Sequence, residues 1–306
     1  MSEAGSNAGE LPTLPPRPAG GHKGTFGTVA VLGGSCAGDA RMIGAPALAA
    51  LGALRAGAGL ARLVMPTPIL GSGIAICPSA TGVGLHVDDR GELVPHLAAE
   101  VIDDVILDST CLVVGPGLGV GEGPAASSLR AVQQEDIPVV VDADAINNLA
   151  LIPQLQRDFR GAAVLTPHPG EFRRLAAALN ITLDPVNEAT RPAAAEALAQ
   201  RLGCIVVLKG MGTVVSDGHQ TWVCTRGHPC LATAGTGDVL SGVIAGIIAQ
   251  HGAGPKRVLS LFDAARIGVQ AHAIAGERWA KSRGASGGLI ATELAEEVPA
   301  ALEGLR

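Results

Sequence analysis

Short apolar runs rich in β-branched residues alternate along the chain with longer stretches rich in Ala and Leu, a pattern typical of strands separated by helices. The first such unit predicts a strand over Thr28–Leu32, a Gly-rich loop at 33–35, a helix over Ala45–Ala58 and a strand over Leu60–Met65. A strand, a helix and a second strand at this spacing form a βαβ unit, which predicts a parallel sheet.

The same pattern recurs toward the C-terminus. Further strands are predicted over Cys111–Val114, Val139–Val141, Ala163–Leu165 and Ile205–Leu208. Further helices are predicted over Pro124–Gln134, from about Phe172, over Pro192–Leu202, and at about 237–250, 257–280 and 290–302. The runs Val214–Ser216 and Thr221–Cys224 predict a hairpin near 213–225. The predicted fold class is therefore α/β, with a mainly parallel central sheet.

Domain organisation follows from the absence of any linker or composition break after residue 21. Residues 22–306 are predicted to form a single domain, and residues 1–21, rich in Gly, Ser and Pro, an extended or disordered tail. The N-terminus lacks the basic-then-apolar pattern of a signal peptide, and no run reaches the ~20 apolar residues of a membrane span. We expect a cytoplasmic protein without membrane contact.

Composition narrows the choice of function. Apolar residues make up 47% of the chain, with four Phe, two Trp and no Tyr, so the core is expected to consist of Ala, Val, Leu and Ile. A net charge of −6 and the scarcity of aromatic residues disfavour nucleic-acid binding. The six cysteines have no C-x-x-C spacing, which indicates small buried residues in a reducing compartment rather than a disulfide framework or zinc site.

The stretch GHPCLATAGTGDVLSG at 227–242 combines small residues with the start of an apolar helix. The Gly235, Thr236 and Gly237 N–H groups would form an anion cradle, because the first N–H groups of a helix lack internal partners and the helix dipole favours negative charge. Asp238 follows at once. Its carboxylate either complements the dipole or acts as a base beside the bound phosphate, which would indicate phosphoryl transfer to a hydroxyl.

Polar residues follow nearly every predicted strand. In open α/β sheets, ligands bind outside the carboxyl ends of the strands, so we expect these side chains to converge on one crevice. The set consists of Ser35, Gly117, Asp142, Asp144, His168, Glu171 and Lys209.

Each of these residues also has a purely structural alternative. His168, between two prolines, either orients a ligand or occupies a turn, and Glu171 either joins it or is a helix-start acid. Lys209 either binds a phosphate or is an edge lysine with a buried stem. Asp142 and Asp144 could hold Mg²⁺ through waters or a ribose hydroxyl, whereas helix N-capping is the preferred role for Asp144.

Several common site types lack support. Gly33-Gly34-Ser35 is not G-x-G-x-x-G, and no G-x-x-x-x-G-K-[ST] occurs, which disfavours a Rossmann dinucleotide fold and a P-loop NTPase. No Ser-His-Asp arrangement and no His/Cys metal cluster can be inferred from the spacing.

Taken together, the motifs resemble those of a known family. They are, in order, His22-Lys23-Gly24-Thr25-Phe26-Gly27, Gly44-Ala45-Pro46-Ala47-Leu48-Ala49-Ala50, Gly115-Pro116-Gly117-Leu118-Gly119, Thr166-Pro167-His168-Pro169-Gly170-Glu171, Lys209-Gly210-Met211-Gly212-Thr213 and Gly235-Thr236-Gly237-Asp238. Over about residues 20 to 302 the chain resembles the ADP-dependent NAD(P)H-hydrate dehydratases of the ribokinase-like superfamily.

The resemblance implies a three-layer α/β/α sandwich and a repair enzyme that removes water from the S epimer of hydrated NADH or NADPH, using ADP or ATP with Mg²⁺ and giving AMP and phosphate from ADP. By position, the residues implied to contact the hydrated nucleotide are Ala45, Gly117, His168 and Asp238. Those implied to hold the adenine nucleotide are Lys209, Gly210, Met211, Gly212, Thr213 and Gly237. Candidate magnesium ligands are Asp142 and Glu171.

Further implications concern partners. The family often carries a fused N-terminal epimerase domain. We expect no room for that domain in this sequence, so a separate epimerase is expected. A homo-oligomer is expected as well. The family motif N-P-G-[ML]-A-T-G-G-T-G-D is altered at His228, Cys230 and Ala234, where nucleotide preference or rate is expected to differ. Two alternatives remain open: a small-molecule kinase of the hydroxyethylthiazole or hydroxymethylpyrimidine type, and a non-catalytic nucleotide-binding regulatory module.

Overall fold

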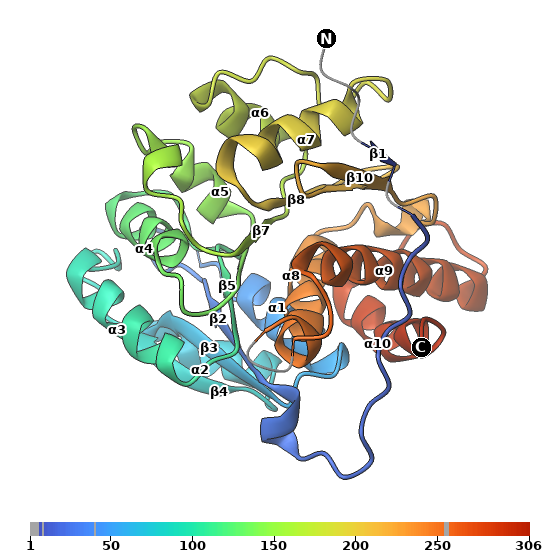
Figure 1. Cartoon of the computed structure of the whole chain (residues 1–306). Coiled ribbons are helices and arrows are strands. Elements are labelled where there is room, and N and C mark those ends of the chain that lie inside the picture. The colour runs from blue at the N-terminus through green and yellow to red at the C-terminus, as the bar shows by residue number, and fades with distance from the viewer. Residues whose placement is uncertain (1–5, 8, 40, 254–256) are drawn as a thin grey trace.

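Ten strands form one mostly parallel sheet in the computed structural model, which describes residues 6, 7, 9–39, 41–253 and 257–306 (Figure 1). Their order is β1-β10-β9-β8-β7-β6-β5-β2-β3-β4. The bounds are β1 Ser6–Asn7, β2 Thr28–Leu32, β3 Leu60–Pro66, β4 Thr81–Leu85, β5 Cys111–Val114, β6 Val139–Val141, β7 Ala163–Leu165, β8 Ile205–Leu208, β9 Val214–Ser216 and β10 Gln220–Val223. Only β9 runs antiparallel to its neighbours, and it forms the predicted hairpin with β10.

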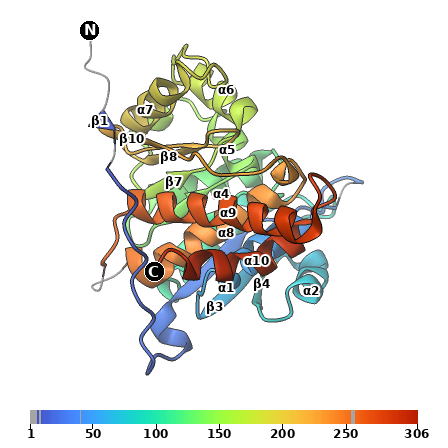
Figure 2. The same ribbon diagram turned by 90° about the vertical axis from the view of Figure 1, so that its right-hand side faces the viewer.

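Helices cover both faces of the sheet, which confirms the predicted three-layer sandwich (Figures 1 and 2). One side carries α1 Gly44–Arg55, α2 Thr67–Ile76, α8 Thr236–Ile247 with the π-helical turn η4 Ile248–Gly252, α9 Leu261–Arg283 and α10 Ala291–Glu303. The other carries α3 Pro95–Leu107, α4 Glu122–Gln133, α5 Asp144–Leu149, α6 Pro169–Ala178 and α7 Arg191–Leu202. Short 3-10 turns are η1 Lys23–Phe26, η2 Leu155–Arg157 and η3 Pro229–Leu231.

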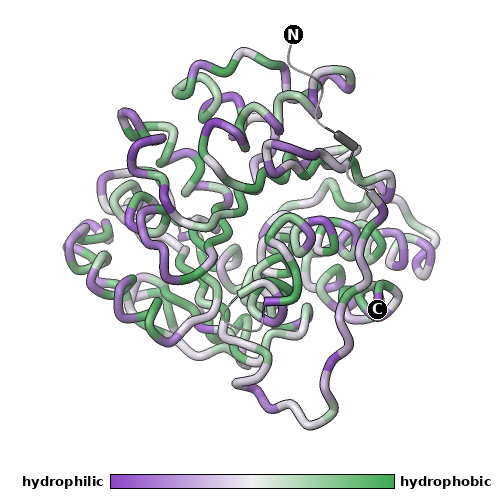
Figure 3. Tube along the Cα trace, in the orientation of Figure 1, coloured by the Kyte–Doolittle hydropathy of each residue, from purple (hydrophilic) through white to green (hydrophobic). Residues whose placement is uncertain are grey.

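The core divides into two clusters because successive strand residues point to opposite faces of the sheet. Val29 and Val31 of β2 pack toward α1 and α8, whereas Ala30 and Leu32 face the opposite layer. Both faces are buried, so the strands are continuously apolar, as parallel sheets between helices require. Figure 3 shows these strands as green segments through the middle of the molecule.

Helices α1 and α8 approach one another unusually closely. A Cβ atom added at Gly242 of α8 would overlap the carbonyl oxygen of Ala49 in α1. Small residues on both helices permit this contact. The Ala-rich composition of the chain supplies these small residues. Because α8 is fixed against α1 along its length, its N-terminus is held in a fixed place at the carboxyl ends of the strands.

Most predicted elements lie where the sequence placed them; six of the described strands, β2 and β5 to β9, have the predicted bounds. The helix predicted at about 257–280 begins at Leu261, because the Ser260 side chain caps it by accepting a hydrogen bond from the Asp263 N–H at 3.0 Å. The helices α2 and α3 and the strands β1 and β4 were not predicted. The sequence of β4, TGVGL, carries two glycines and lacks a β-branched run, so it does not resemble a strand.

The segment over residues 9–21 is extended and lies against the C-terminal helices. Leu14 is buried, and its N–H donates to the Leu305 carbonyl at 2.6 Å. Arg17 donates to the Gly57 carbonyl at 2.7 Å, and Arg266 of α9 donates to the Gly9 carbonyl at 2.6 Å. Residues 1–5 and 8 of the predicted tail lie outside the described residues. Within the described residues, no helix is both long enough and apolar enough to cross a membrane.

The close contact between α1 and α8 predicts that Gly242→Ala lowers the free energy of unfolding by about 1–3 kcal/mol, because the added methyl group overpacks the helix pair. The matched control is Gly71→Ala in α2, where a Cβ atom meets nothing within 4 Å. That change is expected to be neutral or to stabilise the protein by up to about 1 kcal/mol, since Ala favours helix. Urea unfolding of both variants measures the difference; equal effects would contradict the packing argument.

Candidate active site

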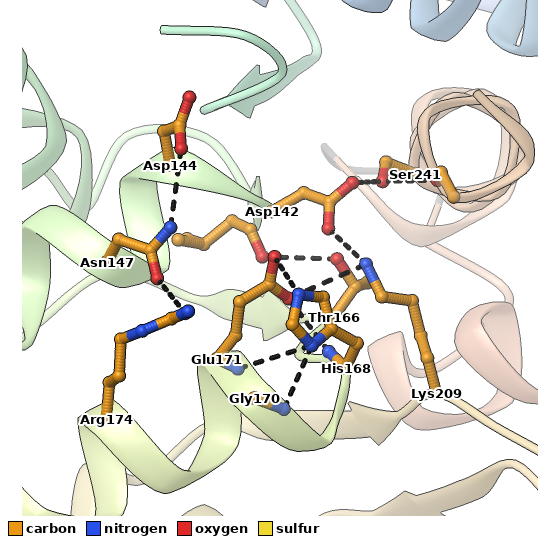
Figure 4. A network of polar contacts seen from close by, with 12 residues as sticks. Asp142, Asp144, Asn147, Thr166, His168, Gly170, Glu171, Arg174, Lys209 and Ser241 are labelled. Carbon is orange, nitrogen blue, oxygen red and sulfur yellow. Dashed lines mark hydrogen bonds and ion pairs between the residues drawn. The ribbon is translucent and has the colours of Figure 1, made fainter. Parts of the chain in front are cut away.

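Three charged side chains meet where neighbouring strands end. Asp142 directly follows β6, Lys209 directly follows β8, and Glu171 lies in the first turn of α6, after β7. The Lys209 Nζ atom is 2.7 Å from Asp142 Oδ1 and 3.8 Å from Glu171 Oε2 (Figure 4). The carboxyl ends of parallel strands meet at one edge of the sheet, so the predicted convergence follows from the topology.

The second oxygen of Asp142 connects this cluster to α8. Asp142 Oδ2 accepts a hydrogen bond from the hydroxyl of Ser241, and Ser241 Oγ also lies 3.0 Å from the Gly237 carbonyl oxygen. Both Asp142 and Ser241 are buried. The pair therefore ties the first turn of α8 to the end of β6. Ser241 was not predicted, because a serine inside an apolar helix carries no distinguishing signal.

His168 and Glu171 form a reciprocal cap at the start of α6. His168 Nδ1 accepts hydrogen bonds from the Gly170 N–H at 2.9 Å and the Glu171 N–H at 3.3 Å, while Glu171 Oε2 accepts from the His168 N–H at 2.8 Å. His168 Nε2 is 3.2 Å from Glu171 Oε1. Burial, with the charge of Lys209, lowers the pKa of His168, so the ring is neutral with its proton on Nε2. The imidazole is thus rigidly oriented, with half of its side chain exposed.

Lys209 is the cation of the cluster. Burial lowers the pKa of Lys209, but the charges of Asp142 and Glu171 raise it by more, so the ammonium stays protonated. Burial also raises the pKa of Glu171, and Lys209 opposes that shift. Lys209 Nζ faces the first turn of α8, since it lies 3.5 Å from where a Cβ atom on Gly237 would be.

Asp238 lies in that first turn, beside the shared ammonium. Burial, then the negative charge of Asp142, raises the pKa of Asp238 to about 7, although Lys209 opposes the shift. Glu171 and Asp144 add further negative charge. Within the described part of the chain, the Asp238 carboxylate accepts no hydrogen bond. A carboxyl group that titrates near neutral pH and has no internal partner is well suited to act as a general base.

The turn before Asp238, the predicted anion cradle, is held by hydrogen bonds from several segments. Gly235 caps α8 in a left-handed conformation with φ 89°, and the Thr236 hydroxyl donates to the carbonyls of Leu231 and Thr233. His272 of α9 lies 2.9 Å from the Thr236 carbonyl through Nε2, and burial lowers its pKa to about 4. The neutral imidazole thus donates to that carbonyl. The Thr236 N–H donates to the Thr233 carbonyl at 3.5 Å, which leaves the N–H groups of Gly237 and Asp238 as the free donors of this turn among the described residues.

Ala45 and Gly117 lie together on the α1 side of the cluster. Gly117 has φ +61°, and a Cβ atom added there would be 3.0 Å from Met42 Cβ and 3.3 Å from Ala45 Cβ. Asp144 holds the neighbouring loop, because its Oδ2 accepts a hydrogen bond from the Gly119 N–H at 2.9 Å. The predicted N-cap role of Asp144 was wrong: Ala143 occupies that position, and the carboxylate turns toward the β5 loop instead.

A cleft of about 830 Å³ opens on the other side of the first turn of α8. Its lining includes Thr236 and Gly237, the loop 209–214, the segment 223–229 after β10, and Val269, His272 and Ala273 of α9. All five residues from Lys209 to Thr213 line it, and Met211 is 89% exposed at its mouth. Ala45, Gly117, His168 and Asp238 lie outside this lining. The wall of the cleft therefore includes Thr236 and Gly237 of the first turn of α8, but not Ala45 or Gly117.

The three altered motif positions have modest structural effects. His228 Nδ1 accepts a hydrogen bond from the Cys230 N–H at 3.3 Å and caps η3, so it can make the hydrogen bond that a smaller capping residue would make. Cys230 is buried, and its thiol is directed at the Gly276 carbonyl oxygen. Ala234 is exposed. Beside them, Gly235 caps α8 and Thr236 to Asp238 form its first turn.

The residues fit a magnesium ion only in part. Among the side chains that the structure describes, no three His, Cys, Asp or Glu form a metal-binding group. Asp142 already contacts Lys209 and Ser241 through its two oxygens. This arrangement suits a Mg²⁺ ion that enters with nucleotide phosphates and takes few protein ligands. The assignment of Asp142 or Glu171 as ligands stays a prediction.

Comparison with solved structures assigns the architecture to the ribokinase-like class. A ribokinase-like superfamily protein from Enterococcus faecalis aligns with TM-score 0.73 at 24% identity, over 96% of this chain and 92% of that one. Hydroxyethylthiazole kinase from Pyrococcus horikoshii shares the fold at TM-score 0.56 and 17% identity, over 85% and 92% of the two chains. At these identities the likeness concerns the fold alone.

The chain belongs to the NAD(P)H-hydrate dehydratase family, whose model matches residues 29–300. A bifunctional NAD(P)H-hydrate repair enzyme from Coxiella burnetii is 38% identical over 94% of this chain and 52% of its own length. An ADP-dependent (S)-NAD(P)H-hydrate dehydratase from Neisseria meningitidis is 37% identical over 90% of this chain and 84% of its own. The ADP/ATP-dependent dehydratase of Bacillus subtilis, co-crystallised with ATP and Mg²⁺, aligns with TM-score 0.76 at 30% identity, over 96% and 95% of the two chains.

The resemblance found in the sequence motifs is thus confirmed at the level of the family. The chain spans about half the length of the bifunctional curated relatives that it matches. Ser241 and His272, which contact Asp142 and the Thr236 carbonyl from distant segments of the chain, were not predicted from the sequence.

The raised pKa of Asp238 predicts how stability depends on pH. The folded protein favours the protonated form of the Asp238 carboxyl group. As pH rises from 3.8, the ordinary pKa of aspartate, to about 7, the unfolded chain loses this proton more readily than the folded protein, so the free energy of unfolding falls. Asp238→Asn removes this cost. At pH 8 the variant is expected to be more stable than the wild type by about 2–4 kcal/mol, and at pH 4 the advantage is expected to vanish. Urea unfolding across this range measures it; a constant difference would contradict the assigned pKa.

Proposed function

We propose that the protein dehydrates the S epimer of hydrated NADH or NADPH in an ADP-dependent reaction, giving NADH or NADPH, AMP and phosphate. The observation that carries this proposal is Asp238, a carboxyl group with a pKa of about 7 beside the free N–H groups of α8 and the Lys209 ammonium. The names of the relatives from Neisseria meningitidis and Bacillus subtilis support the choice of reaction.

The nucleotide would occupy the cleft on one side of the first turn of α8. Lys209 and the residues from Gly210 to Thr213 line that cleft. The Gly210 N–H donates to the Thr213 hydroxyl oxygen at 3.3 Å, so the Lys209 ammonium and the N–H groups of Met211 and Gly212 would bind the phosphates, with Gly237 nearby. The Thr213 hydroxyl donates to the Gly210 carbonyl at 2.9 Å and closes this loop into a turn. Mg²⁺ would enter with the nucleotide and neutralise part of the phosphate charge.

The hydrated nicotinamide would lie on the other side, against Ala45, Gly117 and His168. In the proposed first step, Asp238 accepts the proton of the C6 hydroxyl as its oxygen bonds to the β-phosphorus of ADP, and the bond to the bridging oxygen breaks to leave AMP. The α8 N–H groups and Lys209 stabilise the charge on the transferred phosphoryl group. In the second step the ring nitrogen's electron pair expels phosphate, and loss of a proton restores the dihydropyridine.

The remaining expectations belong to the same proposal. A separate epimerase would supply the S epimer, and a homo-oligomer and a cytoplasmic location stay predictions. The kinase alternative predicts a stable phosphorylated alcohol as product. The regulatory-module alternative depended on His228, Cys230 and Ala234, and the intact conformation of Gly235 to Asp238 weakens that basis.

One assay tests the proposal. Purified protein with ADP, Mg²⁺ and hydrated NADH is expected to regenerate NADH absorbance and to release phosphate and AMP in equal amounts. Asp238→Asn is expected to lower kcat by at least about 100-fold, since a positioned base contributes about 10²–10⁴-fold, while ADP affinity changes little. Near wild-type turnover in the variant would remove Asp238 from the mechanism, and a stable phosphorylated product would favour the kinase.

The separation of the two binding regions generates a further prediction. Gly117→Val would place a branched side chain where a Cβ atom alone is 3.0 Å from Met42 Cβ, in a left-handed conformation that β-branched residues avoid. KM for hydrated NADH is expected to rise at least about tenfold, while the Kd for ADP stays within about twofold. The matched control is Gly121→Ala, where a Cβ atom has only a 3.8 Å contact. An equal loss of ADP affinity in Gly117→Val would contradict the separation.

A further inference from the structure

Arg191 is a buried cation in the wall of the cleft. It is the first residue of α7, its side chain is 7% exposed, and it lines the cleft beside the loop that starts at Lys209. Its guanidinium donates to three main-chain carbonyls: Pro185 at 3.1 Å, Leu208 at 2.8 Å and Lys209 at 2.7 Å. It thereby connects the segment before α7 to the end of β8.

Among the described residues, no acidic side chain forms an ion pair with the positively charged Arg191 side chain. No carboxylate lies within ion-pair distance of its guanidinium in the described ranges. Burial lowers the pKa of Arg191, and a cation at a helix N-terminus is further disfavoured by the dipole. Two electrostatic penalties therefore fall on one residue, and a negatively charged ligand in the cleft would offset them.

Arg266 provides an internal comparison. It is also buried, at 4% exposed, and it donates to the main-chain carbonyls of Gly9 and Glu10. However, Arg266 pairs with Asp263 at 3.0 Å, and it lies outside the lining of the cleft. A buried arginine that only supports the fold thus carries an acidic partner in this protein, whereas the one in the cleft wall does not.

We propose that Arg191 is the positioning residue for nucleotide binding: it holds the Leu208 and Lys209 carbonyls so that the Lys209–Thr213 loop presents the N–H groups of Met211 and Gly212 to the phosphates of a nucleoside diphosphate. The Lys209 and Gly210 N–H groups donate within the protein, to the Pro167 carbonyl and the Thr213 hydroxyl oxygen. The planar fork of a guanidinium suits this task, because its donors reach three carbonyls at once. Its unbalanced positive charge lies behind the same loop and adds to the attraction for phosphate. The inference rests on the proposed function, since the ligand is the proposed co-substrate ADP.

The test uses Arg191→Met, with Arg266→Met as the matched control. Calorimetric titration with ADP and Mg²⁺ is expected to show that Arg191→Met raises the Kd for ADP at least about tenfold, the effect of losing one charged hydrogen bond. In the dehydratase assay, KM for ADP is expected to rise by a similar factor, whereas kcat at saturating ADP stays within about threefold. Arg266→Met is expected to lower the unfolding temperature without changing the Kd for ADP.

Each other outcome is decisive. If Arg191→Met is folded and its Kd for ADP lies within twofold of wild type, the residue is merely structural and the proposal is overturned. If that variant does not fold, Arg191→Lys, which keeps the charge but not the fork, is titrated instead, and its Kd is expected to rise at least about threefold. Wild-type affinity in Arg191→Lys, or failure of both variants to fold, overturns the proposal. If the wild-type protein itself does not bind ADP, the proposed function fails first.

Discussion

One ammonium group is shared among more carboxylates than it can neutralise, and the rest of the site depends on this imbalance. Lys209 contacts Asp142 and Glu171, and Asp238 lies nearby in the first turn of α8. With three acids and one base in a largely buried space, one carboxyl group is driven toward its neutral form near pH 7. That group is Asp238, because Asp142 accepts hydrogen bonds through both oxygens and Glu171 is held by its reciprocal cap with His168.

The fold supplies this arrangement through two constraints. The parallel strands bring Asp142 and Lys209 to one edge of the sheet, and the close contact between α1 and α8 sets the first turn of α8 against that edge. Ser241 then links α8 to Asp142. The same turn thus lines the cleft through Thr236 and Gly237, while α8 packs against α1, which carries Ala45. A phosphoryl group transferred between two substrates would have to pass this point, where the free N–H groups and Lys209 lie.

Much of the fold was predictable because its strands are buried on both faces and therefore appear as continuous apolar runs ending in Gly, Asp, His or Lys. The predicted convergence of Asp142, His168, Glu171 and Lys209 is observed for the same reason. The region from Thr67 to Leu107 was missed, since glycines in β4 obscure its strand pattern. Asp144 was assigned a cap because its sequence position suggests one, but the β5 loop, 25 residues away, competes for its carboxylate. Ser241 and Arg191 act through contacts between distant segments, which spacing along one chain does not encode.

The crowded carboxylates raise the pKa of Asp238 to about 7, and the proposed role of this residue as a base depends on that shift. The most direct test is a carboxyl ¹³C NMR titration of the protein labelled at aspartate, compared with Asp238→Asn. The account predicts one aspartate resonance that titrates near pH 7 in the wild type and is missing from the variant. If every aspartate resonance titrates near the ordinary value of about 4, the cluster does not raise the pKa of Asp238 and the account is contradicted.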